Sequence, residues 1–229
     1  MQTVLKRLLL AAAAGVAIAA AGCAKSQSIS LRYVPDSGVQ ATPKFFPAKV
    51  AVSAVRWDSL DGAVGHVFDT SGKKIANLKI EDSANQIAKV IAQAFQAAGL
   101  QPVTIGAVAP GDKPPPGVDF LASTEIAVIT CEKNFQATSN PEGFRLNTQV
   151  KLKITVLGPG RAPFTGEGVA VIEEPPPGVD LATYKPSITE PADAVSVALS
   201  RAIRSVLEQP TIAHALPHRT MNPFQRSRD

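Results

Sequence analysis

The clearest pattern in the chain is a strict alternation of apolar and polar residues between positions 149 and 156. The apolar positions are Val150, Leu152, Ile154 and Val156. Successive side chains of a strand point to opposite faces, so this pattern predicts a strand with one buried and one solvated face, as in an antiparallel sheet. Largely apolar segments at 119–135 and 164–172 flank it, with turn residues between. The three segments are expected to form a meander.

Weaker alternation predicts further strands upstream. One is expected over 49–57, and another is a short strand at 100–105. Segments 66–68 and 75–80 flank a Thr-Ser-Gly turn and indicate a hairpin. A short alternating piece at 29–33 is compatible with a strand at the sheet edge, although its surroundings are those of a tether.

Helical spacing of apolar residues predicts two helices. The first begins at Asp82-Ser83, where Ser83 and Gln86 have the spacing of a capping box, and it ends at Gly99. The second has Pro191 in its first turn and is expected to stop at Pro210. The order of these elements predicts an α+β fold, with an antiparallel or mixed sheet that contains a three-strand meander and has one face covered by the two helices.

The amino terminus has the pattern of a secretory signal. Lys6 and Arg7 precede an uncharged apolar run from Leu8 to Ala21, and Gly22 comes directly before Cys23. This arrangement resembles the lipobox of bacterial lipoproteins. The resemblance implies cleavage after Gly22 and acylation of Cys23, with palmitate as one of the chains, and two or more acyl chains anchor a protein stably to a bilayer. No other cofactor is expected.

These features divide the chain into four parts. Residues 1–22 are expected to be a lipoprotein signal peptide, 23–47 a lipidated cysteine with a flexible tether, 48–209 a single α+β periplasmic domain, and 210–229 a disordered tail. Removal of the signal leaves 21 basic and 19 acidic side chains, a net charge of +2. That balance gives no electrostatic case for nucleic-acid binding, which favours a clustered basic face.

Candidate catalytic chemistry is sparse. Cys131 lies in a predicted strand and is expected to be a buried thiol, with a reactive or intermolecular role as the alternative. His214 and His218 stand four apart, but Pro217 lies between them and no third ligand joins them, so no metal site is expected. No serine lies in a nucleophile elbow, and the sequence predicts no enzyme activity.

The acidic pairs are also not expected to be catalytic. Glu125 and Glu132 have odd separation on one predicted strand and should lie on opposite faces. Glu173 and Glu174 end a strand and should form a solvated rim. Gly166 and Gly168 are not a phosphate cradle, because no lysine-serine pair follows them and no helix opens there.

A repeated peptide supplies the candidate partner-binding residues. Pro114, Pro115 and Pro116 begin a Pro-Pro-Pro-Gly-Val-Asp sequence that recurs from Pro175, Pro176 and Pro177. Reuse of a stiff connector is favoured over a repeated domain, with partner docking on the prolines as the sharper alternative. Trp57 is the other candidate for partner binding, although a core role is favoured for it.

The chain as a whole resembles the YajG-like group of Gram-negative lipoproteins. The matching features are the peptide around Cys23, the strand-then-helix run to Phe95, the strand 150–156, and the peptide 192–195 that opens a helix ending at Leu207. The resemblance implies a lipid-anchored protein with no established catalytic residues. Position 24 is alanine rather than aspartate, which by analogy with Gram-negative lipoprotein sorting favours the outer membrane, with the domain in the periplasm.

Two function classes follow from these features. The first is a non-enzymatic structural or interaction module of the cell envelope that binds another envelope protein. The alternative, implied by a resemblance in shape to auxiliary lipoproteins of ABC-type lipid transport, is a binding lipoprotein of a lipid or glycan transport system. It would need an apolar cleft between helices and sheet. The sequence does not identify a small-molecule ligand.

Overall fold

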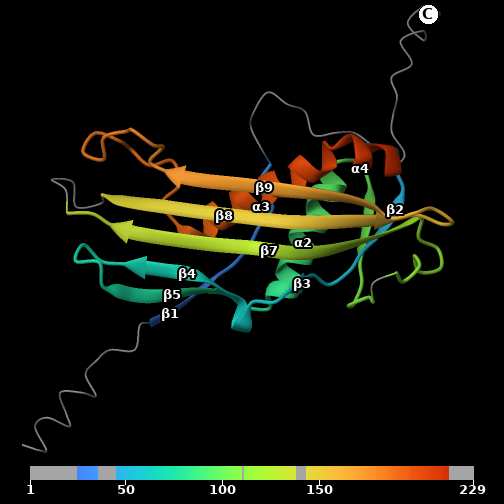
Figure 1. Cartoon of the computed structure of the whole chain (residues 1–229), viewed down its shortest axis with the longest axis horizontal. Helices are drawn as coiled ribbons and strands as arrows, with labels where there is room; N and C mark the ends of the chain where they lie inside the picture. The colour runs from blue at the N-terminus through green and yellow to red at the C-terminus, as the bar shows by residue number, and fades with distance from the viewer. Residues whose placement is uncertain (1–24, 36–44, 110, 138–142, 217–229) are drawn as a thin grey trace, which may run out of the picture.

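The computed structural model of the chain describes residues 25–35, 45–109, 111–137 and 143–216. The described residues form one nine-stranded sheet with helices packed on it, an α+β fold (Figure 1). The strands are β1 Lys25–Ile29, β2 Lys49–Val52, β3 Arg56–Trp57, β4 Ala63–Phe68, β5 Lys74–Ile80, β6 Gln101–Thr104, β7 Phe120–Phe135, β8 Phe144–Leu157 and β9 Phe164–Glu174. The helices are the 3-10 turn η1 Leu60–Gly62 and α2 Ser83–Ala97, α3 Pro191–Leu207 and α4 Pro210–Ala215.

The longest strand, β7, is the axis of the sheet. On one side it pairs with β8 in antiparallel fashion from Leu121↔Leu157 to Phe135↔Phe144. β8 in turn pairs with β9, again antiparallel, which confirms the predicted meander. Strict alternation in β8 dictates this arrangement, because its four alternating apolar residues are all buried on one face.

The other side of β7 pairs with three short strands in succession. β2, β3 and β4 all run parallel to β7, so the sheet is mixed. β6 extends the sheet beside β2, while β5 and β1 extend it beside β4. The expected strand at 49–57 is thus divided into β2 and β3, and the expected hairpin is the antiparallel pair β4–β5.

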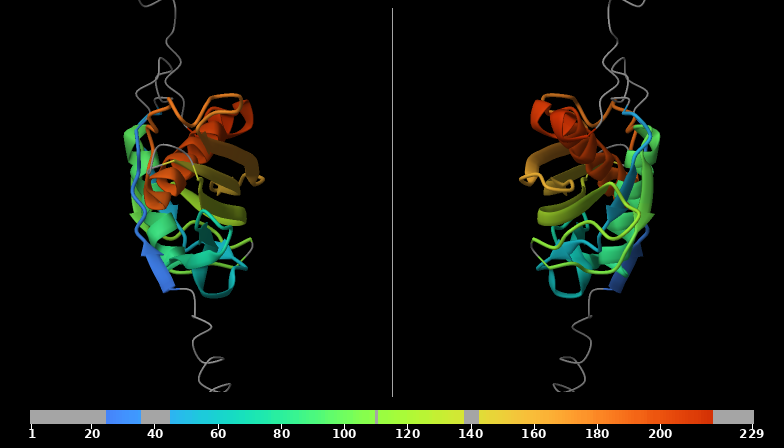
Figure 2. Two further views of the ribbon diagram at one scale, coloured as in Figure 1. Left: turned by 90° about the vertical axis from the view of Figure 1, so that its left-hand side faces the viewer. Right: turned by 90° about the vertical axis from the view of Figure 1, so that its right-hand side faces the viewer.

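One face of the sheet is covered by helices, as predicted. α2 packs on β2 and β6, α3 crosses β7, β8 and β9, and α4 packs against β9 and β8. Figure 2 shows the helices gathered on one side of the sheet. Their apolar stripes are fully buried, and burial of each large aliphatic side chain contributes about 1.5–3 kcal/mol.

Close packing between α3 and β9 depends on two glycines. A Cβ at Gly168 would lie 2.0 Å from the carbonyl oxygen of Ala202, and one at Gly166 would lie 2.9 Å from Cγ1 of Val206. The Gly-Glu-Gly peptide is therefore a helix-packing site, which explains its residue types without any phosphate.

The flexible tether expected over 23–47 is wrong for residues 25–35 and 45–47. β1 pairs in parallel with β5 over five residue pairs, from Lys25↔Ala76 to Ile29↔Ile80. The Leu31 amide donates to Oε1 of Gln86 at 2.8 Å, and Phe45 is buried. Residues 36–44 lie outside the described part of the chain.

The hydrogen bond from the Leu31 amide to Gln86 shows that the expected capping box does not form. Nε2 of Gln86 donates to the Glu81 carbonyl at 2.6 Å, so both ends of its amide are used outside the helix terminus. Asp82, at the start of α2, has a left-handed backbone and makes no side-chain cap.

The disordered tail expected over 210–229 is wrong for its first residues. Helix α3 already ends at Leu207, before Pro210. Pro210 instead begins the short helix α4. Ile212, Ala215 and Leu216 are buried in the core. The rest of the expected tail, 217–229, lies outside the described residues.

Candidate functional site

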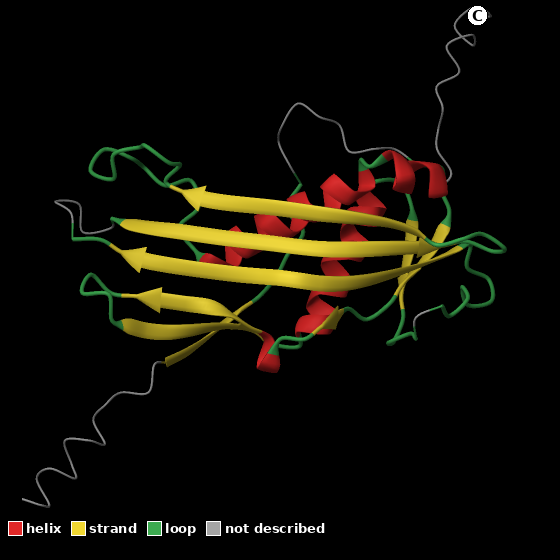
Figure 3. Ribbon diagram, viewed as in Figure 1, coloured by secondary structure: helices red, strands yellow, loops and turns green. Residues whose placement is uncertain are grey.

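The outer face of the meander is a surface on which a partner could be recognised. No described helix covers it, as Figure 3 shows. Its side chains are mainly polar or charged, but Val169 and Val171 on β9 are 51% and 49% exposed. Two neighbouring exposed valines on one strand are an apolar feature that the sequence analysis did not single out.

Charges on this face are paired across strands. Nζ of Lys151 lies 3.8 Å from a carboxylate oxygen of Glu167, and a guanidinium nitrogen of Arg56 lies 4.0 Å from one of Glu125. Such exposed pairs contribute about 0–1 kcal/mol each. The face therefore presents alternating signs of charge.

β9 is also an edge of the sheet, because it pairs with β8 alone. Gln209 covers part of this edge, since its Nε2 donates to the Glu167 carbonyl at 2.5 Å. The two valines lie further along the strand, next to Ala170. A long edge strand with exposed apolar residues is a template for pairing with another chain.

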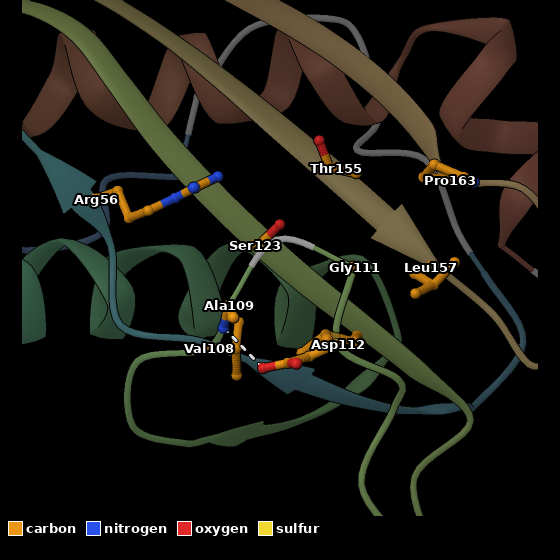
Figure 4. Close-up of a pocket in the computed structure, with 10 residues that line it drawn as sticks. Arg56, Val108, Ala109, Gly111, Asp112, Ser123, Thr155, Leu157 and Pro163 are labelled. Atoms are coloured by element: carbon orange, nitrogen blue, oxygen red, sulfur yellow. Dashed lines mark hydrogen bonds between the residues drawn. The ribbon is translucent and has the colours of Figure 1, made fainter.

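A cavity of about 320 Å³ opens on the same face, beneath the loop that precedes β7 (Figure 4). Arg56, Ser123 and Thr155 reach it from three neighbouring strands. The loop is closed by a hydrogen bond from the Ala109 amide to Oδ2 of Asp112, 2.7 Å long. These side chains offer one cation and two hydroxyls, and Asp112 adds a carboxylate to the lining.

A second cavity, of about 390 Å³, lies between β1, the end of β7 and the start of α3. One of its walls is Lys133, a buried lysine whose Nζ donates to the Thr189 carbonyl at 2.8 Å. The ammonium lies 5.1 Å and 4.7 Å from the ring centroids of Phe135 and Phe144, within cation–π range. The sequence analysis missed Lys133, because a lysine inside an apolar strand gives no sign of which rings will surround it.

Cys131 is a buried thiol, as predicted. The hydroxyl of Thr148 donates to its Sγ at 3.2 Å. Burial raises the pKa of the Cys131 thiol to about 11. A thiolate is the reactive form of cysteine, so this position is unsuited to nucleophilic chemistry at neutral pH.

Glu125 and Glu132 are not on opposite faces, contrary to the expectation. A bulge between Ile126 and Val128 adds one residue to β7 and reverses the alternation, so both glutamates are exposed on the open face. Seven residues of strand still separate them by about 20 Å, too far for a shared proton or water.

Glu174 does not belong to a solvated rim either. It is 5% exposed and accepts hydrogen bonds from the Tyr184 hydroxyl and from the amide and hydroxyl of Ser187. The Tyr184 pKa is raised because its hydroxyl donates to this carboxylate. Glu174 therefore ties the loop before α3 to the end of β9, while Glu173 is exposed as expected.

The two proline connectors are the same turn used twice. Val118 donates to the Pro115 carbonyl and Val179 to the Pro176 carbonyl, at 3.2 and 3.3 Å. The glycine of each copy, Gly117 or Gly178, has a φ near +80°, as the third position of a type II turn requires. This supports reuse of a connector.

The structure does not bring the candidate partner-binding residues together. Pro114, Pro115 and Pro116 precede the start of β7, whereas Pro175, Pro176 and Pro177 follow the end of β9, which runs in the same direction. Pro175 is buried, and Trp57 is half-buried against the core. Gly22 and Cys23 lie outside the described residues, so their predicted cleavage and acylation stay predictions.

The histidines form no cluster in the described ranges. His66 Nδ1 lies 3.1 Å from Oδ1 of Asn77 on the adjacent strand. His214 is in α4, and His218 lies outside the described residues. Within the described residues no group of three His, Cys, Asp or Glu side chains could hold a metal, and no helix is long and apolar enough to span a membrane.

These features define an α+β protein with one covered and one open sheet face. No protein-family model and no curated protein matches the chain. Among solved structures it is similar to a Xanthomonas campestris protein of the family DUF330, at 12% identity over 84% of this chain and 93% of that one, with a TM-score of 0.40. It is also similar to PelC from Paraburkholderia phytofirmans, solved as a dodecamer, at 9% identity over 73% and 92%, with a TM-score of 0.37.

Proposed function

We propose that this chain is a lipid-anchored lipoprotein of the outer membrane, with its domain in the periplasm, that acts as a non-enzymatic module for binding another envelope protein. The amino-terminal pattern supports the anchor: a basic start, an apolar run, and Gly22 before Cys23. Each buried methylene of an acyl chain contributes about 0.8 kcal/mol, so two or three chains hold the protein stably. We also propose that the chain is related to the YajG-like lipoproteins.

The observation that carries the interaction role is the edge of β9. Val169 and Val171 expose half of their area on a strand that lacks a partner on its outer side within the described part of the sheet. An incoming strand would pair with the backbone of β9 and cover both valines. Backbone pairing gives affinity, and the valines and neighbouring charges give register.

The second candidate is an auxiliary lipoprotein of ABC-type lipid or glycan transport. The cavity of about 390 Å³ between β1, β7 and α3 favours it, because it lies beside the helix layer and has the size of a ligand site. It ranks second because Lys25, Lys133 and Glu190 share its lining with apolar residues, whereas a lipid cleft would be mostly apolar.

The proposal is tested by placing a photo-cross-linking amino acid at Val171 in the full chain and irradiating living cells. Val103, which is 48% exposed on the edge strand β6, is the matched control. We expect one discrete protein adduct at Val171 that is lost when Val169 is replaced by lysine, and none at Val103. Equal adducts at both sites would contradict the interaction role, and recovery of a transporter permease at Val171 would favour the second candidate.

A further inference from the structure

We propose that one corner of the sheet rests on the membrane surface, with anionic lipid headgroups as its partner. We call it the basic corner, and it consists of Lys25, Lys73, Lys74 and Ile75. This inference rests on the proposed acylation of Cys23 and adds to it the orientation of the domain on the bilayer.

The length of chain between the anchor and the fold carries the inference. Cys23 precedes Lys25 by two residues, which span at most about 7 Å even when fully extended. β1 begins at Lys25 and is paired with β5 from its first residue, Lys25↔Ala76. An acylated Cys23 therefore brings the start of β1 to the headgroup layer.

The segment after β1 is bound to the helices, so β1 is attached to the fold at its carboxyl end as well. The amides of Arg32 and Val34 donate to the hydroxyls of Ser196 and Ser200 on α3, at 3.2 and 2.9 Å. The Arg32 guanidinium also pairs with Asp193 at 2.8 Å. Contacts to both α2 and α3 keep this part of the chain in the fold, so the bilayer is close to β5 as well.

The residues beside the start of β1 have the chemistry of a lipid-facing surface. Lys25, Lys73 and Lys74 are exposed, and Ile75 is a large apolar residue with 42% exposure. Lysines adsorb to anionic headgroups, about fivefold in affinity for each, and an exposed isoleucine can enter the interface. Without a covering surface, the isoleucine would stay exposed to water.

Acidic residues reduce this charge only in part. Asp69, in the turn of the β4–β5 hairpin, accepts hydrogen bonds from the Ser71 hydroxyl and from the amides of Ser71 and Lys73 at 2.6–2.9 Å. These bonds lower the pKa of Asp69 and fix the turn that presents Lys73. Glu190 lies across the adjoining cavity, whose wall also carries the ammonium of Lys133. The four lysines named here therefore outnumber the two acidic residues around the basic corner.

The orientation that follows leaves the candidate interaction edge free. β1 and β9 are the opposite edges of the sheet, separated by β5, β4, β7 and β8 (Figure 1). Five strand spacings place β9 about 24 Å from β1. With the basic corner on the bilayer, Val169 and Val171 remain accessible to a protein partner.

The test uses the full chain in cells, with a photo-cross-linking amino acid at Ile75 and, as the matched control, at Val169. Palmitate incorporation is measured in the same samples. We expect phospholipid adducts at Ile75 and background at Val169. Charge reversal with Lys73→Glu and Lys74→Glu is expected to lower the adducts at Ile75 while palmitate incorporation stays unchanged.

A second variant carries ten Gly/Ser residues inserted between Ala24 and Lys25, a coil of about 17 Å. We expect it to incorporate palmitate normally and to lose most adducts at Ile75. Palmitate incorporation with equal lipid adducts at Ile75 and Val169, or with protein adducts at Ile75, would overturn the orientation alone. Absence of palmitate would overturn both the anchor and the orientation.

Discussion

Replacement of Gly168 by alanine tests the packing that builds the helix-covered face. The added Cβ would lie 2.0 Å from the Ala202 carbonyl oxygen and 2.9 Å from Cγ2 of Val206. Both atoms belong to α3, and the nearer one is backbone, which no rotamer change can remove. The helix must therefore move away from β9 or the strand must bend.

The expected cost is at the upper end for overpacking of a core, about 3 kcal/mol. α3 has eleven buried residues, so a shift of the whole helix loosens contacts along its length. A loss of about 3 kcal/mol lowers the urea midpoint by about 1.5 M if the slope is about 2 kcal/mol/M. It lowers Tm by about 6–12 °C for a domain of this size.

The assay is urea unfolding of the chain from residue 24 onward, followed by fluorescence of Trp57, the single tryptophan. Gly106→Ala is the matched control, because a Cβ there has nothing within 4 Å and Gly106 has no positive φ. The control should stay within about 0.5 kcal/mol of wild type. A Gly168→Ala midpoint equal to that of the control would refute the close approach of α3 to β9.

Four further predictions concern Cys131, Lys133 and the Glu174–Tyr184 pair. Because the Cys131 pKa is raised from 9.0 to about 11, iodoacetamide at pH 8 should modify it at least about a hundredfold more slowly in the native chain than in urea. The folded-state pKa exceeds the unfolded one, so this thiol supports stability below pH 9 and loses that contribution between pH 9 and about 11, which the urea midpoint across this range should show. Lys133→Met removes the hydrogen bond to Thr189 and two cation–π contacts and should cost about 1–3 kcal/mol by urea unfolding, and a neutral result would contradict the role of the ammonium. Glu174→Gln should lower the pKa of Tyr184, because the carboxylate that raises it is gone. The titration is followed by the ultraviolet absorbance of tyrosinate, and an unchanged titration would count against the Tyr184–Glu174 hydrogen bond.

Strand β8 and the two long helices could be predicted because their apolar residues recur at a regular spacing. In β8 the inward positions from 150 to 156 are all apolar, and only one strand register buries that set. The faces of β7 could not be predicted in the same way. A bulge after Ile126 adds one residue and moves Glu132 to the face of Glu125. A bulge leaves no mark in a strand with apolar residues on both sides of it.

The amino-terminal strand could not be predicted for a different reason. β1 is the peptide Lys-Ser-Gln-Ser-Ile, in which the apolar side chain of Ile29 alone is buried. Its place is set by parallel pairing with β5 and by side chains of distant helices, such as Gln86 and Ser196. Such long-range contacts leave no local periodicity, so the segment has the composition of a tether.

In the candidate site, too, features with a local sequence pattern could be predicted and features set by tertiary pairing could not. The sequence identified Cys131 as a buried thiol, because the apolar run at 126–129 before it predicts a strand. It did not identify the edge position of Val169 and Val171, since the order of strands in a sheet depends on tertiary pairing. The proline repeat was visible, but the separation of its two copies depends on the strand directions of β7 and β9.

The most direct test of the account compares wild type with Cys23→Ser by palmitate labelling and by membrane fractionation after a high-salt wash. We predict that wild type is labelled and stays with the membranes. The variant should be unlabelled and not cleaved after Gly22, with no label on the buried Cys131. A variant that is still cleaved there and still sediments with washed membranes would contradict acylation as the anchor.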